Sequence, residues 1–402
     1  MGMIEYSEAL RIILERAPGP RGTEDVSLKE AHGRVLGRDI ASDVNLPPFN
    51  KSAMDGFAVR TSDLSEIPKV LKVVMDIPAG VRPKGSLGPG EAASVMTGAP
   101  VPEGADAVVQ VEWTSGFGRD EVTINRAITP GKNVSPMGEI LREGATVMTA
   151  GQKIDVEEVS LLAAVGSDPV PVYRVPRVAV LSSGDEVVPP SHKPGPAQIR
   201  DSNGPALLNF IRSLGLEAID LGHMRDDPEA IKNAVSRGLE YDCLLISGGV
   251  SAGAYDYVQD VFGDLGVDVH LKRVAVKPGK PTVFGTHESG MVFGLPGNPV
   301  SAVVIARVLV APALGKAMGL GSLGPRTIRA RLARDIKKKP DRLWFIYGVL
   351  NLDGEVTVVP VSNRGSADLP AATLGKCLIV APKGVSQVEK DSMVDVVVWD
   401  RW

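Results

Sequence analysis

Cysteine and histidine are both scarce in this chain. Its 402 residues include only two cysteines, Cys243 and Cys377. Neither belongs to a Cys-x-x-Cys or His/Cys spacing, so a structural zinc site is not expected, and two cysteines cannot build the disulfide framework of a small secreted protein. The five histidines show no metal-site or triad spacing and are interpreted as surface or loop residues.

An excess of one charge sign and long apolar runs are also missing. The formal net charge is -4, which does not provide the dense basic face of a nucleic-acid-binding protein, so no nucleic-acid partner is expected. No run approaches 18 consecutive apolar residues, and residues 1–17 are mixed in polarity. We therefore expect no membrane partner, no signal peptide and, by default, a cytoplasmic location.

What is present is the composition of an ordinary globular protein. Hydrophobic residues make up 44% and charged residues 23% of a chain longer than one core usually serves, so several domains are expected. Aromatic residues are only 4%, so the cores should consist mainly of Val, Leu, Ile and Ala.

Strand and helix patterns alternate in the middle of the chain, and this alternation predicts a parallel α/β sheet with right-handed crossovers. The predicted strands are 177–181, 217–221, 243–247, 268–276, 281–285 and 291–295, and the predicted helices are 204–214, 228–239, 255–265 and 300–318.

The flanking regions have different patterns. Residues 4–17 have helical spacing with Ser7 as a plausible N-cap, and residues 26–40 look helical in part. Short β-branched runs between Gly and Pro predict a β-rich module over about residues 45–145. After Gly319, further strand patterns between residues 327 and 399 predict a small β-barrel.

Four polar, mostly Gly-bearing segments should meet at one edge of the α/β sheet, because ligands bind beyond the carboxyl ends of its strands. They are residues 182–186, 247–251, 277–281 and 296–301. Glycine lets backbone N–H groups approach a ligand, a helix N-terminus adds positive charge, and Lys277 and Lys280 add ammonium groups. The pattern predicts an oxyanion or phosphate pocket. Neither a GxGxxG fingerprint nor a P-loop is present, which disfavours dinucleotide and P-loop chemistry.

Carboxylates cluster in sequence near the same edge, and they suit Mg²⁺, which prefers oxygen ligands and phosphates. They are Asp185, Glu186, Asp201, Asp226, Asp227 and Asp256. The alternative for Asp201 and Asp227 is helix capping, and Asp256 could equally be a first-turn residue that favours the helix dipole.

Several motifs give the chain a resemblance to a known family. They are Asn50-Lys51-Ser52-Ala53-Met54-Asp55-Gly56-Phe57-Ala58-Val59-Arg60, Met96-Thr97-Gly98-Ala99-Pro100-Val101-Pro102, and residues 183–186, 200–203, 247–251, 277–281 and 296–299. Over essentially its whole length the sequence resembles the MoeA / gephyrin E-domain family, the molybdopterin molybdenumtransferases.

The resemblance implies a multidomain α/β fold. Its expected parts are an N-terminal linker domain (1–45 and 140–176), a β-rich domain (46–139), a MoaB/MogA-like molybdopterin-binding sheet domain (177–322) and a C-terminal β-barrel (323–402). It also implies an elongated homodimer, in which the sheet domain of one subunit meets the Asp55-bearing domain of the other.

The implied reaction inserts molybdate into adenylylated molybdopterin and releases AMP with the help of Mg²⁺. A molybdopterin adenylyltransferase is a further partner that the resemblance allows for. The residues expected to act in catalysis are Asp55, Glu186, Asp227, Asp256, Lys277 and Lys280, of which the four carboxylates would also hold the metal. The residues expected to bind the pterin substrate are Ser183, Gly184, Asp185, Asp201, Ser202, Asn203, Ser247, Gly248, Gly249, Ser251, Pro296, Gly297, Asn298, Pro299 and Ser301.

Two departures from the family pattern leave alternatives open. Ile140 stands where relatives usually carry Asp, and the usual Gly-Arg-x-Glu-Phe-x-Arg reads Asp341-Arg342-Leu343-Trp344-Phe345-Ile346-Tyr347 here. A pterin- or nucleotide-binding paralogue with weakened catalysis is therefore a second hypothesis. A scaffold protein is a third, since gephyrin-type relatives also cluster receptors.

Overall fold

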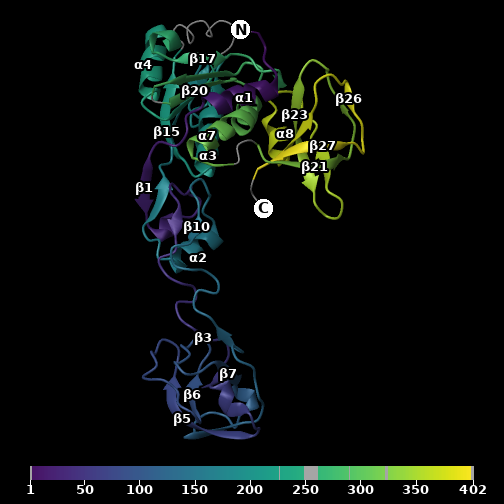
Figure 1. Cartoon of the computed structure of the whole chain (residues 1–402). Coiled ribbons are helices and arrows are strands. Elements are labelled where there is room, and N and C mark those ends of the chain that lie inside the picture. The colour runs from purple at the N-terminus through teal and green to yellow at the C-terminus, as the bar shows by residue number, and fades with distance from the viewer. Residues whose placement is uncertain (1, 226, 249–260, 289, 322–324, 400–402) are drawn as a thin grey trace.

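The computed structural model describes residues 2–225, 227–248, 261–288, 290–321 and 325–399. The molecule is elongated (Figure 1). An α/β unit and a C-terminal barrel lie side by side at one end, a β-rich unit lies at the other, and a small unit connects them. The residue limits of the four domains, as the sequence analysis gave them, stay a prediction.

The α/β unit is built on a six-stranded sheet. Its order is β15 (Glu217–Met224), β12 (Arg177–Ser183), β16 (Cys243–Ser247), β20 (Gly290–Leu295), β19 (Val283–His287) and β17 (Asp268–Leu271). The first four strands are parallel, as predicted, but β19 is antiparallel to both β20 and β17. The reason is chain length, since β19 ends at His287 and β20 begins at Gly290, too close for a crossover.

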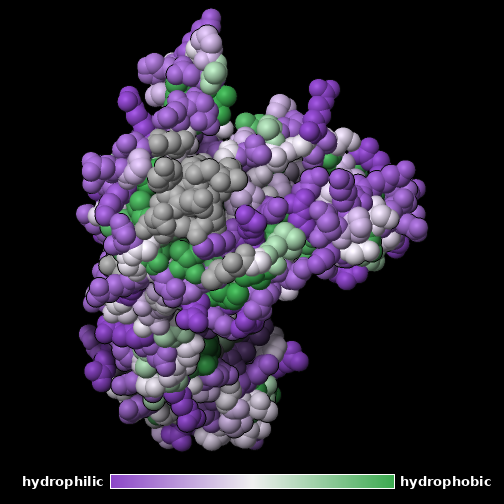
Figure 2. Space-filling model, turned by 90° about the horizontal axis from the view of Figure 1, so that it is seen from above, coloured by the Kyte–Doolittle hydropathy of each residue, from purple (hydrophilic) through white to green (hydrophobic). Residues whose placement is uncertain are grey.

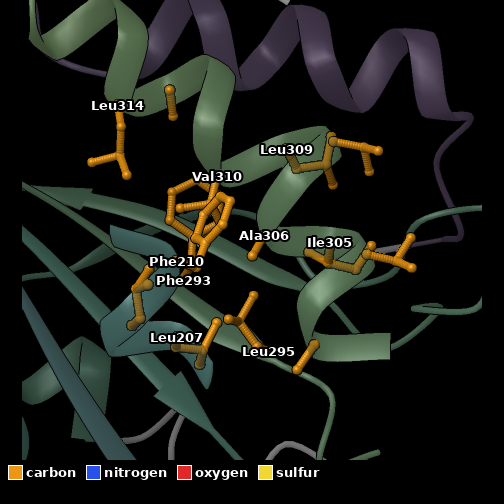
Figure 3. Packing of buried hydrophobic residues seen from close by; sticks show 14 of the residues in the cluster. Leu207, Phe210, Phe293, Leu295, Ile305, Ala306, Leu309, Val310 and Leu314 are labelled. Carbon is orange, nitrogen blue, oxygen red and sulfur yellow. The ribbon is translucent and has the colours of Figure 1, made fainter. Parts of the chain in front are cut away.

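Both faces of this sheet are buried, because successive strand side chains point in opposite directions. On β12, Val178 and Val180 join the core that contains α3 (Asn203–Ser213), while Ala179 and Leu181 join the core that contains α4 (Pro228–Gly238). Parallel strands covered on both faces read as continuous apolar runs, which explains why the sequence pattern identified them. Figure 3 shows side chains of the first core, including Leu207, Phe210, Phe293 and Leu295.

The predicted helix 300–318 is interrupted. It consists of α6 (Pro299–Ile305), a π-helical turn (Ala306–Val310) and α7 (Ala311–Ala317). The π-helical turn ends two residues before Pro312, which has no N–H for a regular bond to the carbonyl of Val308. By length and composition Pro299–Ala317 could cross a membrane, but 78% of its most apolar window is buried inside the protein, where it serves as a core helix.

The N-terminal segment contains less helix than predicted. α1 (Tyr6–Arg16) starts after Glu5 without a side-chain cap, so Ser7 as N-cap is wrong, and the helix packs into the α/β core through Ala9 and Ile13. Residues 26–40 form only the 3₁₀ turn η1 (Leu28–Glu30) besides strand residues.

The small connecting unit is made of segments far apart in sequence. β1 (Thr23–Val26) pairs with β11 (Val170–Tyr173), and β2 (Ile40–Ala41) pairs with β10 (Thr146–Met148). α2 (Val156–Ala164) covers them and begins with a capping box made by Asp155 and Glu158.

Two further sheets form the ends of the molecule. The β-rich unit has the order β7 (Ala107–Gln110), β4 (Gly56–Val59), β6 (Glu91–Val95), β5 (Lys69–Ile77) and β8 (Glu121–Ile124), and beside it β3 (Lys51–Ser52) pairs with β9 (Val134–Ser135). The barrel has the order β23 (Leu343–Asn351), β24 (Thr357–Pro360), β21 (Thr327–Leu332), β27 (Met393–Val398) and β25 (Cys377–Ala381), and the β23–β25 pairing closes it. The predicted C-terminal barrel is confirmed. Figure 2 shows that its surface, like most of the face seen from above, is mainly hydrophilic.

Candidate active site

The register of the sheet brings three of the predicted loops together. Ser182 of β12 lies opposite Ser247 of β16, and Ser247 lies opposite Leu295 of β20. The chain therefore leaves these three parallel strands at the same level, beyond their carboxyl ends, where α/β sheets bind ligands.

Asn203, the first residue of α3, joins two of these loops. Its Nδ2 donates to Oγ of Ser247 and to the carbonyl oxygen of Gly297, each over 2.8 Å. One amide group thus holds the ends of β16 and β20 at a fixed separation, a role that sequence reasoning did not give it.

Asp201 acts through the backbone of α3. Its carboxylate accepts from Oγ of Ser182 at 2.7 Å and from the backbone N–H groups of Asn203 and Gly204 at 3.0 and 2.9 Å. It therefore satisfies orphan N–H groups at the start of the helix and also fixes the end of β12. The helix-capping alternative describes Asp201 in this structure.

Gly248 marks a close approach between the loops after β12 and β16. Its φ is +88°, and a Cβ built on it would lie 2.4 Å from the carbonyl oxygen of Ser183. Only a residue without a side chain fits this backbone contact.

Gly248→Ala should therefore destabilise the α/β unit more than Gly215→Ala. Gly215 has a similar φ of +79°, and a Cβ built on it would have no other atom within 4 Å. Gly215→Ala therefore measures only the cost of a side chain in the left-handed conformation, on the order of 1 kcal/mol. Gly248→Ala adds the clash with Ser183, and we expect a total loss of about 3 kcal/mol. Calorimetric unfolding of the two variants measures the difference, and equal losses would contradict the close packing of these loops.

A cavity of about 1010 Å³ lies beside this edge, between the α/β unit and the barrel. From the α/β unit it is lined by Glu186, Lys277, Lys280, Pro296, Gly297, Asn298 and Ser301, all predicted site residues. The barrel adds residues that the sequence analysis did not assign to the site, among them Arg334, Asp335, Lys337, Arg342, Trp344 and Arg364. Asn298 connects the two walls, since its Nδ2 donates to Oγ of Ser366 at 2.9 Å.

The charge of this cavity is positive. Its cationic side chains are Lys277, Lys280, Arg334, Lys337, Arg342 and Arg364, and its acidic ones are Glu186 and Asp335. Within the described part of the chain, neither Lys277 nor Lys280 has a carboxylate within 4.0 Å. Cationic side chains that keep their charge while lining a cavity attract an anionic ligand. Two sequence signals point to the barrel wall: the basic run Lys337-Lys338-Lys339, and the motif Asp341–Tyr347, which contains Arg342 and Trp344.

Asp55 lies far from this cavity in the same chain. It follows β3, in the β-rich unit that the connecting unit separates from the α/β sheet (Figure 1). Its exposed Oδ1 accepts from the backbone N–H of Thr97 at 2.6 Å and from Oγ1 of Thr97 at 2.7 Å. The hydroxyl contact, followed by the backbone one, lowers the pKa of Asp55, so its carboxylate is ionised at neutral pH.

The predicted metal ligands that the structure describes, Asp55, Glu186 and Asp227, do not form a three-residue metal group within one chain. Asp227 is the N-cap of α4 and accepts from the backbone N–H of Ala230 at 2.9 Å, as the capping alternative has it. Asp256, like Gly249 and Ser251, lies outside the described residues. Across the ranges that the structure describes, no three His, Cys, Asp or Glu side chains group to hold a metal ion. The described residues of a single chain therefore do not by themselves provide a ligand set for Mg²⁺.

The remaining predicted binders surround the strand ends. The carbonyl oxygen of Gly184 accepts from Nε2 of His223 at 2.7 Å. Ser183 is buried at the end of β12, Asp185 is exposed after it, Ser202 precedes α3 without a capping bond, and Pro299 starts α6. The parallel α/β sheet and the positively charged cavity at its carboxyl edge are typical of one class of protein, the α/β proteins that bind anionic small molecules.

Comparison with known proteins narrows this class. Residues 4–166 match the MoeA N-terminal region (domain I and II), residues 179–316 a probable molybdopterin binding domain, and residues 329–399 the MoeA C-terminal region (domain IV). Molybdopterin molybdenumtransferase 2 of Mycobacterium tuberculosis is 41% identical over 385 residues, 93% of this chain and 94% of that protein. Molybdopterin molybdenumtransferase of Haemophilus influenzae is 34% identical over 398 residues, 98% of each chain.

Solved structures agree. The crystal structure of a molybdopterin biosynthesis MoeA protein from Pyrococcus horikosii superposes with a TM-score of 0.86 at 34% identity, and the match covers 100% of both chains. The chain belongs to the MoeA family of molybdopterin molybdenumtransferases, as its motifs predicted, and it is a transferase enzyme of molybdenum cofactor biosynthesis.

Proposed function

We propose that this chain inserts molybdate into adenylylated molybdopterin and releases AMP. In balance, water cleaves the P–O–P bond, and the two dithiolene S–H groups pass their protons to one oxygen of molybdate, which leaves as water while both sulfurs bind molybdenum. No electrons are transferred. The observation that carries the proposal is the positively charged cavity beside the ends of β12, β16 and β20.

The cavity suits a large anion. Its volume of about 1010 Å³ is at the upper end of ordinary ligand pockets, which span roughly 300–1,000 Å³. Gly297, Asn298, Val300 and Ser301, just before and in the first turn of α6, line the cavity, and N–H groups there would hold a phosphate. Lys277 and Lys280 line it as well, and together with Ser301 they would bind the molybdate oxygens.

We further propose that the active site is completed by a second copy of the chain, which brings Asp55 to this edge. The loops beside Asp55 support protein contact there, because they expose four large apolar side chains. These are Phe49, Met54, Met137 and Ile140, with exposed fractions of 38%, 39%, 57% and 76%. They lie on neighbouring segments, since β3 pairs with β9 and Asn50 Oδ1 accepts from the N–H of Met137.

Magnesium and the other partners remain predictions from the resemblance. No step is assigned to a bound metal, because the described carboxylates of one chain do not group. Asp256 as a metal ligand is one of these predictions. A Mg²⁺ ion held together with the Asp55 of a second chain is another. A substrate-delivering adenylyltransferase and a cytoplasmic location are proposed on the same ground.

The direct test incubates purified protein with adenylylated molybdopterin and molybdate, with and without Mg²⁺. We expect AMP release and formation of a cofactor that reconstitutes an apo-molybdoenzyme. Tight binding of the substrate without AMP release would instead identify the binding paralogue with weakened catalysis.

Asp55→Asn should reduce AMP release at least tenfold, a rise of about 1.4 kcal/mol in the barrier, without changing the melting temperature. The side chain is exposed and its carboxylate is held ready by Thr97, so its loss removes charge rather than packing. Asp76→Asn is the matched control, since Asp76 is an exposed carboxylate on β5 of the same unit. Full activity of Asp55→Asn would remove this residue from the site.

A further inference from the structure

Trp344 and Lys277 meet at the junction between the α/β unit and the barrel. β18 (Val276–Lys277) belongs to the α/β unit but pairs in parallel with β23 of the barrel, and Lys277 lies directly opposite Trp344. The ammonium nitrogen of Lys277 is 3.8 Å from the centroid of the indole ring. Both residues line the cavity.

One backbone and one side-chain hydrogen bond fix this pair of strands. The N–H of Leu343 donates to the carbonyl oxygen of Ala275 at 3.1 Å, and Nη1 of Arg342 donates to the carbonyl oxygen of Val276 at 3.4 Å. The ring is therefore presented to Lys277 by the sheet itself.

An aromatic ring can hold an ammonium group in place without neutralising its charge, which a carboxylate cannot do. The ring attracts the cation through its quadrupole but carries no charge of its own. A carboxylate at the same place would hold Lys277 equally well and cancel its charge. Lys277 sits on a flexible four-carbon stem and has no carboxylate within 4.0 Å among the described residues, so the ring is what restrains it.

Lys338, a second lysine near the same ring, provides a contrast. Its ammonium nitrogen lies 5.8 Å from the ring centroid, but it also donates to the carbonyl oxygens of Pro382 and Val385 at 2.8 and 3.2 Å. Lys338 is thus fixed independently of the ring.

We propose that Trp344 is a positioning residue for oxyanion binding, which holds the ammonium group of Lys277 on the cavity wall with its full charge. The inference rests on the proposed function and deepens it. Binding of the oxyanion then requires less side-chain ordering than it would with a mobile lysine, and this difference appears as affinity.

The test measures binding of molybdate alone by calorimetry to the native protein, Trp344→Phe and Trp344→Leu. Leu removes the ring, and we expect affinity to fall about threefold to tenfold, the range of an exposed to partly desolvated cation–π contact. Phe keeps an aromatic face, and it breaks no hydrogen bond, because Nε1 of Trp344 has no partner among the described residues. We expect Trp344→Phe to stay within about threefold of the native affinity.

A double-mutant cycle with Lys277→Met separates positioning from simple packing. If Trp344 acts through Lys277, Trp344→Leu has no further effect in the Lys277→Met background. An equal loss in both backgrounds, or no loss from Trp344→Leu in a native protein that binds molybdate, would overturn the inference while leaving the proposed function standing. A native protein that does not bind molybdate would overturn the oxyanion site and this inference with it.

Discussion

A heterodimer of one Asp55→Asn chain and one Lys277→Met/Lys280→Met chain is expected to recover about half of the native activity, because one of two symmetric sites is then intact. Each parent homodimer should have lost at least tenfold, since both of its sites carry a lesion. The reason is the distance within one chain between the β-rich unit and the α/β sheet (Figure 1).

The heterodimer is isolated by placing different affinity tags on the two chains and purifying through both. AMP release per dimer is then compared with the native protein and with each parent. A Lys277→Met/Lys280→Met chain paired with the Asp76→Asn control should stay at about half activity too, since its partner chain keeps a native Lys pair and meets a native Asp55. If the site lay within a single chain, the Asp55→Asn heterodimer would remain as inactive as its parents.

Phe293→Ala should cause the largest loss of stability, about 3–5 kcal/mol in the α/β unit. Phe293 lies on the central strand β20, is fully buried, and its ring centroid is 4.9 Å from that of Phe284. Figure 3 shows it between side chains of α3 and the Pro299–Ala317 helix, so its removal leaves a cavity that rigid strands and helices cannot close.

Calorimetry, with hydrogen exchange of the β16 and β20 amides, assigns the loss to the α/β unit, since several units need not unfold in one step. Phe117→Ala is the matched control. Phe117 is 39% exposed in the β-rich unit, and its deletion should cost about 1 kcal/mol or less. Equal losses for the two variants would contradict the role of Phe293 in the core.

The part of the site that could be predicted from sequence is the part that follows strands directly. Gly297, Asn298 and Ser301 line the cavity, because the end of a buried strand can be recognised from its apolar run and parallel strands end at one edge. Lys277 and Lys280 line it too, but β18, which carries Lys277, pairs with the barrel and not with the parallel strands. By contrast, some of the carboxylates that were predicted to act at the site bind backbone N–H groups at the start of a helix instead. Asp201 and Asp227 cap helices, an assignment that needs the backbone N–H positions as well as the residue type.

The barrel wall could not be predicted in this way. Arg334, Arg342, Trp344 and Arg364 reach the cavity because β18, which follows the edge strand β17 of the α/β sheet, pairs with β23 of the barrel, a two-residue contact between distant segments. Such a short pairing has no periodicity to reveal it.

The amino-acid sequence alone determined the strand and helix alternation, the position of the polar loops and, through its motifs, the family. These depend on local patterns of apolar side chains, glycine and charge, which each segment carries with it. Only the tertiary structure decided that the lysines face a barrel rather than solvent, that Trp344 lies over Lys277, and that Asp55 is remote from both. Those relations arise when chain segments more than sixty residues apart pack together, and that packing energy is distributed over contacts that no single segment contains.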